Sequence, residues 1–211
     1  MEAKRPFAGA ESRNPKKITL LRHNRAAEFV LIVKTTNTMT TEQIESAREQ
    51  IHAFGARYDY DTAYMESMLA ASPEGFARFQ PVAEMAGFQC ELAPEVTAVA
   101  RVATFVTVDC GPCLELNLKL AREAGVADDV LRGALRCGVG LRSDLVEVRN
   151  FAAQVAAGES PDPALMAALK HRYGEAGMVE IALAIAGSMM FPAVKRAMGF
   201  ARSCAVTKFS V

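Results

Sequence analysis

The sequence lacks several features that would assign it quickly to a functional class. It holds three histidines, and none of them stands three to five residues from a cysteine or another histidine. A zinc ribbon needs two ligand pairs at matching spacing, and only one pair of closely spaced cysteines exists. No phosphate-binding loop, nucleotide fingerprint or nucleic-acid motif is present. We therefore expect no metal and no nucleotide cofactor.

The chain also lacks an excess of one charge, but its charges are unevenly divided. The 211 residues hold 24 Lys or Arg and 24 Asp or Glu, whereas residues 1–38 carry eight basic side chains against three acidic ones. The rest of the chain is mildly acidic, which argues against nucleic acid as a partner. Because residues 1–38 also lack helical periodicity, we expect a basic, mobile extension there and one all-helical domain over residues 39–211.

No apolar run reaches the roughly 18 residues that a membrane-spanning helix needs. The longest candidate, residues 179–194, contains Glu180 and Pro192 and is expected to be a buried core helix. We therefore predict no membrane partner. Five cysteines is an odd number, and no cleavable signal peptide precedes them, which predicts a cytoplasmic protein with reduced thiols.

Helix signals recur from residue 40 to residue 201 and predict an all-α fold. Polar capping residues precede apolar stretches of helical period, and glycine and proline separate the stretches. Pro81 is expected to end or kink the helix that Ser72 and Pro73 open. The predicted helices begin near Thr41, Asp61, Ser72, Pro94, Asp109, Asp128, Ser143, Ser160, Met178 and Phe191. The last two, residues 178–190 and 191–202, are apolar over most of their circumference, which predicts a homo-oligomer.

One motif carries chemistry: Cys110 and Cys113 stand three positions apart in VDCGPCLEL, at the predicted start of a helix. Asp109 is placed to act as the N-cap, and Pro112 falls in the first turn. The spacing puts both thiols on one face, where they can form a disulfide or share a proton. A helix N-terminus favours the thiolate, whereas the Asp109 carboxylate opposes it, and the sequence leaves the balance open. Two inert, packed cysteines remain the alternative.

The tetrapeptide CGPC resembles the active-site motif of thioredoxin, but residues 114–200 offer no strands for a thioredoxin fold. A wider resemblance covers residues 94–200: an alanine-rich helix leading into CxxC, then AREAGV, and finally ALKHRYGEAGMVEIALAIAGSMMFPAVKRAMG. This region resembles the carboxymuconolactone decarboxylase-like, or AhpD-like, superfamily. The resemblance implies a helical bundle that assembles into dimers, trimers or hexamers. It also implies a dithiol that reduces hydroperoxides or serves a partner peroxiredoxin, with Cys113 attacking and Cys110 as its disulfide partner.

Two departures from the family pattern weaken this implication. The peroxidase members carry a histidine four residues after the second cysteine and a glutamate twelve residues before the first, and this chain has Asn117 and Ala98 there. The proton relay to the thiol is therefore missing. Glu95 lies nearly one turn before Ala98 and can face the same way, and Asn117 can donate a hydrogen bond to a thiolate. Glu115 is expected to face elsewhere.

The sequence thus predicts a thiol oxidoreductase that cycles Cys110 and Cys113, with Asn117 and Glu95 as candidate helpers. Its partner is expected to be a hydroperoxide, a lipoyl group or other small thiol, or a thiol protein such as a peroxiredoxin. Without the family histidine and glutamate, peroxidase activity is expected to be weak. Two alternatives stay open: a redox-inactive helical binding or oligomerisation member of the family, and a small-molecule enzyme of the carboxymuconolactone decarboxylase type.

Overall fold

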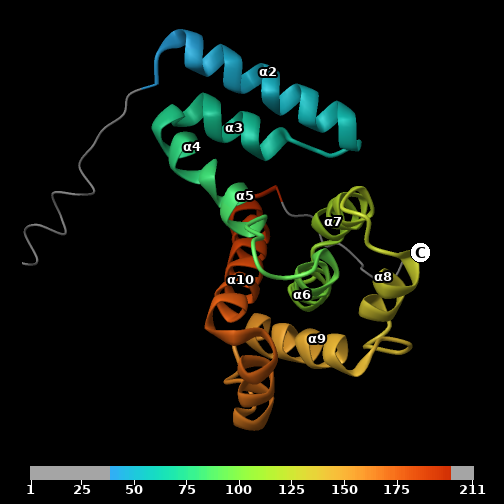
Figure 1. Cartoon of the computed structure of the whole chain (residues 1–211). Coiled ribbons are helices and arrows are strands. Elements are labelled where there is room, and N and C mark those ends of the chain that lie inside the picture. The colour runs from blue at the N-terminus through green and yellow to red at the C-terminus, as the bar shows by residue number, and fades with distance from the viewer. Residues whose placement is uncertain (1–38, 201–211) are drawn as a thin grey trace, which may run out of the picture. The chain divides into compact units, whose positions relative to one another are not determined.

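Short sequence signals mark the ends of most helices in residues 39–200, the part of the chain that this computed structural model describes (Figure 1). In chain order the helices are α2 (Thr41–Tyr58), α3 (Ala63–Ala71), α4 (Pro73–Phe79), α5 (Pro81–Ala86), α6 (Pro94–Thr107), α7 (Gly111–Glu123), α8 (Asp128–Leu135), α9 (Ser143–Ala156) and α10 (Pro163–Ala197). These residues contain no strand, so the all-α prediction is confirmed for them. The predicted basic extension, residues 1–38, lies outside the described residues.

Proline and serine act at the helix ends as the sequence predicts. The Ser72 hydroxyl accepts a hydrogen bond from the Gly75 N–H at 3.0 Å, with Pro73 in the first turn. Pro81 ends α4 at Phe79 and begins α5, because a proline has no N–H to continue the first helix. These turns set the direction in which α3, α4 and α5 follow one another.

The predicted cap of α2 is wrong by one residue. Thr40, rather than Thr41, is the N-cap, and its hydroxyl accepts a hydrogen bond from the Gln43 N–H at 3.2 Å. The Gln43 side chain accepts one from the Thr40 N–H at 2.9 Å, which completes a capping box. Thr40 and Thr41 are both suitable N-cap residues by type. Only Thr40 stands three residues before a Gln or Glu, which a capping box requires.

The three helices predicted after residue 160 form two helices, which meet at a kink within α10. Its backbone leaves the helical region only at Gly174, with φ 67° and ψ 179°. The predicted boundary at Phe191 is wrong, because the chain stays helical through Pro192. Loss of one N–H is tolerated there because Pro192 lies in a packed, buried segment of the helix.

The apolar part of α10 lies against the rest of the fold. Judged by length and composition alone, α10 is the one helix in residues 39–200 that is apolar enough to cross a membrane, and half of its most apolar window is buried. Ile181, Ala184 and Ile185 are buried, as predicted for a core helix. Glu180 is also buried, and its carboxylate accepts hydrogen bonds from the N–H groups of Glu91 and Leu92. Glu180 therefore holds the segment before α6 against α10.

Helix α6 occupies the centre of the largest core. It packs against α7, α8, α9 and α10 (Figure 1), and side chains on nearly all of its circumference are buried. Helices α2, α3 and α4 share a second, smaller cluster formed by Ala47, Ile51, Leu69 and Phe76. The C-terminal end of α2 is joined to α7 because Arg57 and Tyr58 both bind the Glu123 carboxylate. This junction brings the α2–α3 connection next to the cysteine helix.

Candidate functional site

Both cysteines of the motif lie at the start of α7 with very little exposure. Cys110 is the N-cap residue and is 5% exposed, and Cys113 in the first turn is 2% exposed. Both are free thiols. Pro112 lies in the first turn as predicted. The structure therefore confirms the predicted placement of the dithiol at a helix N-terminus.

The predicted N-cap, Asp109, does not cap α7. Its backbone is left-handed, with φ 51°, and its side chain is exposed. The Cys110 N–H donates to the Phe105 carbonyl at 3.2 Å, so the chain has already turned before the helix begins. Aspartate tolerates the left-handed region better than most residues, which explains an aspartate at the turn itself rather than at the cap.

The two thiols differ strongly in acidity. The pKa of Cys110 is lowered to about 6, chiefly because the Cys113 thiol donates a hydrogen bond to it. The positive charges of Lys195 and Arg196 lower it further, against the opposing effect of burial. The pKa of Cys113 is raised, because Cys113 is the hydrogen-bond donor of the pair and is buried. The two thiols titrate as a pair, and the hydrogen bond from Cys113 together with the charge of Lys195 favours the thiolate on Cys110.

A lysine from the other end of the chain supplies part of the field on these thiols. Lys195 on α10 is 5% exposed, and no carboxylate of the described residues pairs with it. Its ammonium nitrogen lies over the rings of Tyr60 and Tyr64, 4.3 Å and 4.8 Å from their centroids. The Tyr60 hydroxyl lies 3.9 Å from Cys113 Sγ. The faces of the two tyrosine rings and a cysteine thiolate are all electron-rich. They therefore stabilise the charged form of Lys195, although no carboxylate among the described residues pairs with it.

Arg196 acts on the turn that precedes the cysteines. Its guanidinium donates hydrogen bonds to the carbonyls of Val108 and Asp109, the second at 3.2 Å. These carbonyls lie at the end of α6, where the helix leaves them without helical partners. Arg196 thereby joins α10 to the connection that sets the position of Cys110.

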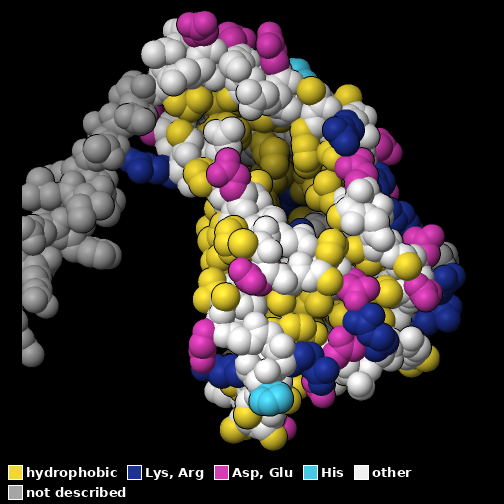
Figure 2. All heavy atoms as spheres, viewed as in Figure 1, with side chains coloured by type: hydrophobic (Ala, Val, Ile, Leu, Met, Phe, Trp, Pro, Cys, Tyr) yellow, Lys and Arg dark blue, Asp and Glu magenta, His cyan; other side chains and the backbone are white. Residues whose placement is uncertain are grey.

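A cavity of about 170 Å³ lies next to Cys113. Its walls come from α2, α3, α5, α6, α7 and α10, and they are mostly aromatic or aliphatic. Figure 2 shows this face hollowed and lined with hydrophobic side chains between the α2–α3 pair and α7. Cys113 borders the cavity and Cys110 does not. A small organic molecule can therefore approach the dithiol from the Cys113 side.

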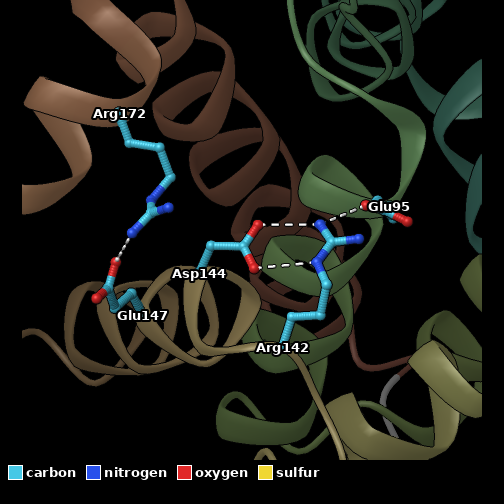
Figure 3. Close-up of polar contacts among 5 residues, drawn as sticks. All are labelled: Glu95, Arg142, Asp144, Glu147 and Arg172. Atoms are coloured by element: carbon cyan, nitrogen blue, oxygen red, sulfur yellow. Dashed lines mark hydrogen bonds and ion pairs between the residues drawn. The ribbon is translucent and has the colours of Figure 1, made fainter.

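The structure places one of the two predicted helper residues at this site. Asn117 borders the cavity, but its amide donates to the Cys113 carbonyl at 3.0 Å rather than to a thiol. Glu95 does not border the cavity, and its carboxylate is held by Arg142 at 2.7 Å (Figure 3). Glu115 is exposed and pairs with Lys119, as expected for a side chain that faces elsewhere.

Figure 3 shows the ion pairs that surround Glu95. Arg142, at the start of α9, binds Asp144 and Glu95 together, while Arg172 binds Glu147 nearby. The pair of charges on Asp144 and Glu95 raises the pKa of Arg142 and fixes its guanidinium. Glu95 therefore links α6 to α9 instead of serving as a base.

The sequence analysis missed Tyr60, Tyr64 and Lys195. The tyrosines lie some 50 residues before the motif and the lysine some 80 residues after it, so no local pattern joins them. The one sequence feature that could have pointed to Lys195 is its position within an apolar helix, since lysine is rarely buried unless it is paired. No protein-family model, curated protein or solved structure matched the chain in the comparisons.

Proposed function

We propose that this chain is a thiol–disulfide oxidoreductase of AhpD-like type, in which Cys110 and Cys113 cycle between dithiol and disulfide. The observation that supports the proposal is the position of Cys110 and Cys113 together at the start of α7, where the Cys113 thiol and Lys195 lower the pKa of Cys110. A thiolate at neutral pH is the reactive form of cysteine in exchange reactions. A packed structural cysteine has no need of such surroundings.

The acidity of the two thiols assigns the attacking role to Cys110. This assignment reverses the one that the family resemblance implies, because a raised pKa leaves Cys113 protonated. The Cys110 thiolate attacks one sulfur of a substrate disulfide, forming a mixed disulfide and releasing one thiolate. Cys113 then loses its proton and attacks Cys110 Sγ, which releases the second thiolate. Two electrons pass to the substrate, and the pair becomes a disulfide.

The preferred substrates are small disulfides or lipoyl groups, and a small dithiol can return the pair to its reduced state. With a hydroperoxide, the Cys110 thiolate would take the distal oxygen as sulfenic acid, an alcohol would leave, and attack by Cys113 would release water. That reaction is proposed to be slow, because Asn117 and Ala98 replace the family's histidine and glutamate. A peroxiredoxin partner and a homo-oligomer of two, three or six copies belong to the same proposal.

The test is alkylation of the reduced protein across pH 4–10, with each cysteine read separately by mass spectrometry. We expect the rate at Cys110 to reach half its maximum near pH 6 and the rate at Cys113 to rise only in strongly alkaline solution. Turnover of a lipoamide disulfide should disappear in both Cys110→Ser and Cys113→Ser. The Cys90→Ser variant, which removes an exposed cysteine outside the motif, is the matched control and should keep full turnover.

The burial of both thiols favours one alternative, a redox-inactive member of the fold whose cysteines are merely packed. Exposures of 5% and 2% leave little room for a large substrate. In that case both thiols would react slowly with ordinary or raised pKa values, and neither serine variant would change any disulfide turnover. This outcome would refute the oxidoreductase proposal.

A further inference from the structure

The cavity beside Cys113 contains one cation and no acidic side chain. Arg101 on α6 borders it, and none of the other lining residues is Asp or Glu. Arg101 has no ion pair in the part of the chain that the structure describes. Its guanidinium donates to Thr97 alone, from Nε to the carbonyl at 3.2 Å and from one terminal nitrogen to the hydroxyl at 2.8 Å.

The Arg101 guanidinium has N–H donors that make no hydrogen bond to the described residues. It carries five N–H donors, and the two bonds to Thr97 leave three. Burial lowers the pKa of Arg101, which shows that nearby groups do not compensate its charge. Arg101 is half-buried, so its charge is partly removed from water and gains from a partner, and the planar fork of arginine matches a carboxylate.

Two residues with hydroxyl groups line the same cavity. Ser188 and Tyr64 both line the cavity and are 1% exposed. The Ser188 hydroxyl has no hydrogen-bond partner among the described residues, whereas the Tyr64 hydroxyl interacts with that of Tyr60. A hydroxyl buried without a partner costs stability unless a ligand or water satisfies it. A ligand group that reaches the Ser188 hydroxyl would offset this cost, in addition to its charge pair with Arg101.

The remaining lining residues indicate the size and polarity of the rest of the ligand. They are chiefly phenylalanine, leucine, methionine and alanine, such as Phe54, Phe105, Leu120 and Phe191. An apolar cavity of roughly 150 Å³ accommodates a benzene ring, so about 170 Å³ accommodates a ring with a short substituent. A second hollow of about 30 Å³, also bordered by Arg101, is large enough for about one water.

From these contacts we infer that the cavity binds a small apolar monocarboxylate, with its carboxylate on Arg101 and its hydrocarbon body against the aromatic walls. Such a ligand would lie beside Cys113 and fill the approach to the dithiol. The site does not require the cysteines to react. It therefore stands or falls separately from the proposed oxidoreductase activity.

The experiment measures binding of phenylacetate and of its neutral match, phenylacetamide, to the full chain by calorimetry. We expect phenylacetate to bind at least about tenfold more tightly than the amide, since a hydrogen-bonded charge pair commonly supplies that factor. In Arg101→Gln the preference should vanish, while in Arg136→Gln, which removes an exposed arginine outside the cavity, it should be unchanged. Equal affinity of the wild type for both probes, or no binding of phenylacetate, would overturn the inference.

Two more variants keep the outcome interpretable. Arg101→Lys retains the positive charge but not the planar guanidinium, so it should keep part of the preference for phenylacetate over phenylacetamide. A partial preference would show that the loss in Arg101→Gln comes from the missing charge and not from misfolding. Ser188→Leu fills the cavity and should weaken both probes by about tenfold or more. Cys110→Ser, which alters the cysteine that does not border the cavity, should retain the preference for phenylacetate over the amide. Retention of the acid preference in Arg101→Gln would refute the role of Arg101, whatever the cysteines do.

Discussion

Lys195 lies over the ring of Tyr60, with its ammonium nitrogen 4.3 Å from the ring centroid, although the two residues are 135 positions apart. Neither residue has much contact with solvent. A cation–π contact with a partly desolvated ammonium contributes about 2 kcal/mol. That contribution is smaller than the cost of burying a lone ammonium, so a nearby anion is needed as well. The Cys110 thiolate is the anion that this part of the fold offers.

The first prediction concerns this lysine. In Lys195→Met the pKa of Cys110 should rise, because the ammonium that favours the thiolate is gone. Alkylation of Cys110 at pH 6 should slow by a factor on the order of ten. Lys170→Met is the control, because Lys170 is half-exposed and pairs with Glu175 elsewhere on the fold. An unchanged rate in Lys195→Met would show that the lysine is only a packing residue.

The second prediction concerns the hydrogen bond between the two thiols. Cys113→Ala removes the donor that lowers the pKa of Cys110 most, so this pKa should rise towards its ordinary value. Cys113→Ser keeps an O–H donor in the same place and should leave the pKa of Cys110 closer to about 6. Alkylation of Cys110 against pH in both variants measures the difference. Identical curves for alanine and serine would exclude the hydrogen bond as the main cause.

The third prediction is a pH dependence of stability in the reduced protein. The folded chain releases the Cys110 proton near pH 6, below the ordinary cysteine value of about 8.5, so the free energy of unfolding should rise from pH 6 to about 8.5. Cys110 can contribute about 3 kcal/mol by pH 8.5. The pKa of Cys113 is raised on folding, so its contribution is present below about pH 8.5 and is lost at higher pH.

Urea denaturation at several pH values, with Cys110→Ser as the reference, isolates this dependence. The difference between the wild type and the variant should grow between pH 6 and 8.5 and then stop growing. A difference that is constant across this range would mean that Cys110 has the same pKa in the folded and unfolded chains.

The fourth prediction concerns Glu95, which the sequence made a candidate base. Glu95→Gln should leave the pKa of Cys110 and any disulfide turnover unchanged, because its carboxylate is bound by Arg142 and does not border the cavity. The free energy of unfolding should fall by about 1 kcal/mol or less, since Arg142 is largely exposed. A loss of turnover with normal folding would restore Glu95 as a functional residue.

The fifth prediction tests the packing of α5 against α10. A Cβ at Gly187 would lie 2.6 Å from Ala86 Cβ and 2.7 Å from Ala86 Cα, so Gly187→Ala forces the two helices apart. We expect a loss of about 1–3 kcal/mol in chemical denaturation. Val179→Ala, at an exposed position of the same helix, should change stability by about 0.5 kcal/mol or less. A neutral Gly187→Ala would show that the α5–α10 contact is loose.

Much of the local structure was predictable because its causes are local. Pro73, Pro81 and Pro94 each start a helix where the sequence places them, since a proline acts on its own turn. The errors have equally local causes. The left-handed turn at Asp109 moved the cap to Cys110, and burial around Pro192 kept one helix where a break was expected.

The candidate site was predictable only in part. The spacing of Cys110 and Cys113 is a property of one helical turn, and it survives in the structure. The side chains that decide which thiol is ionised come from α10 and from the α2–α3 connection, and nothing in a single sequence shows that these segments meet. The contact of Glu95 with Arg142 could not be predicted for the same reason, because the two residues lie 47 positions apart.

The isolation of Lys195 from acidic groups has an energetic consequence for the proposed cycle. When the pair becomes a disulfide, the charge on Cys110 disappears, and no carboxylate within residues 39–200 pairs with the buried ammonium in its place. The dithiol state is therefore favoured, and the reduction potential of the couple is raised by about 30 mV for each 1.4 kcal/mol of that preference. A couple of this kind gains electrons readily, so the return of its disulfide to the dithiol by a small dithiol is the favoured half of the proposed cycle, and reduction of the substrate disulfide is the harder half.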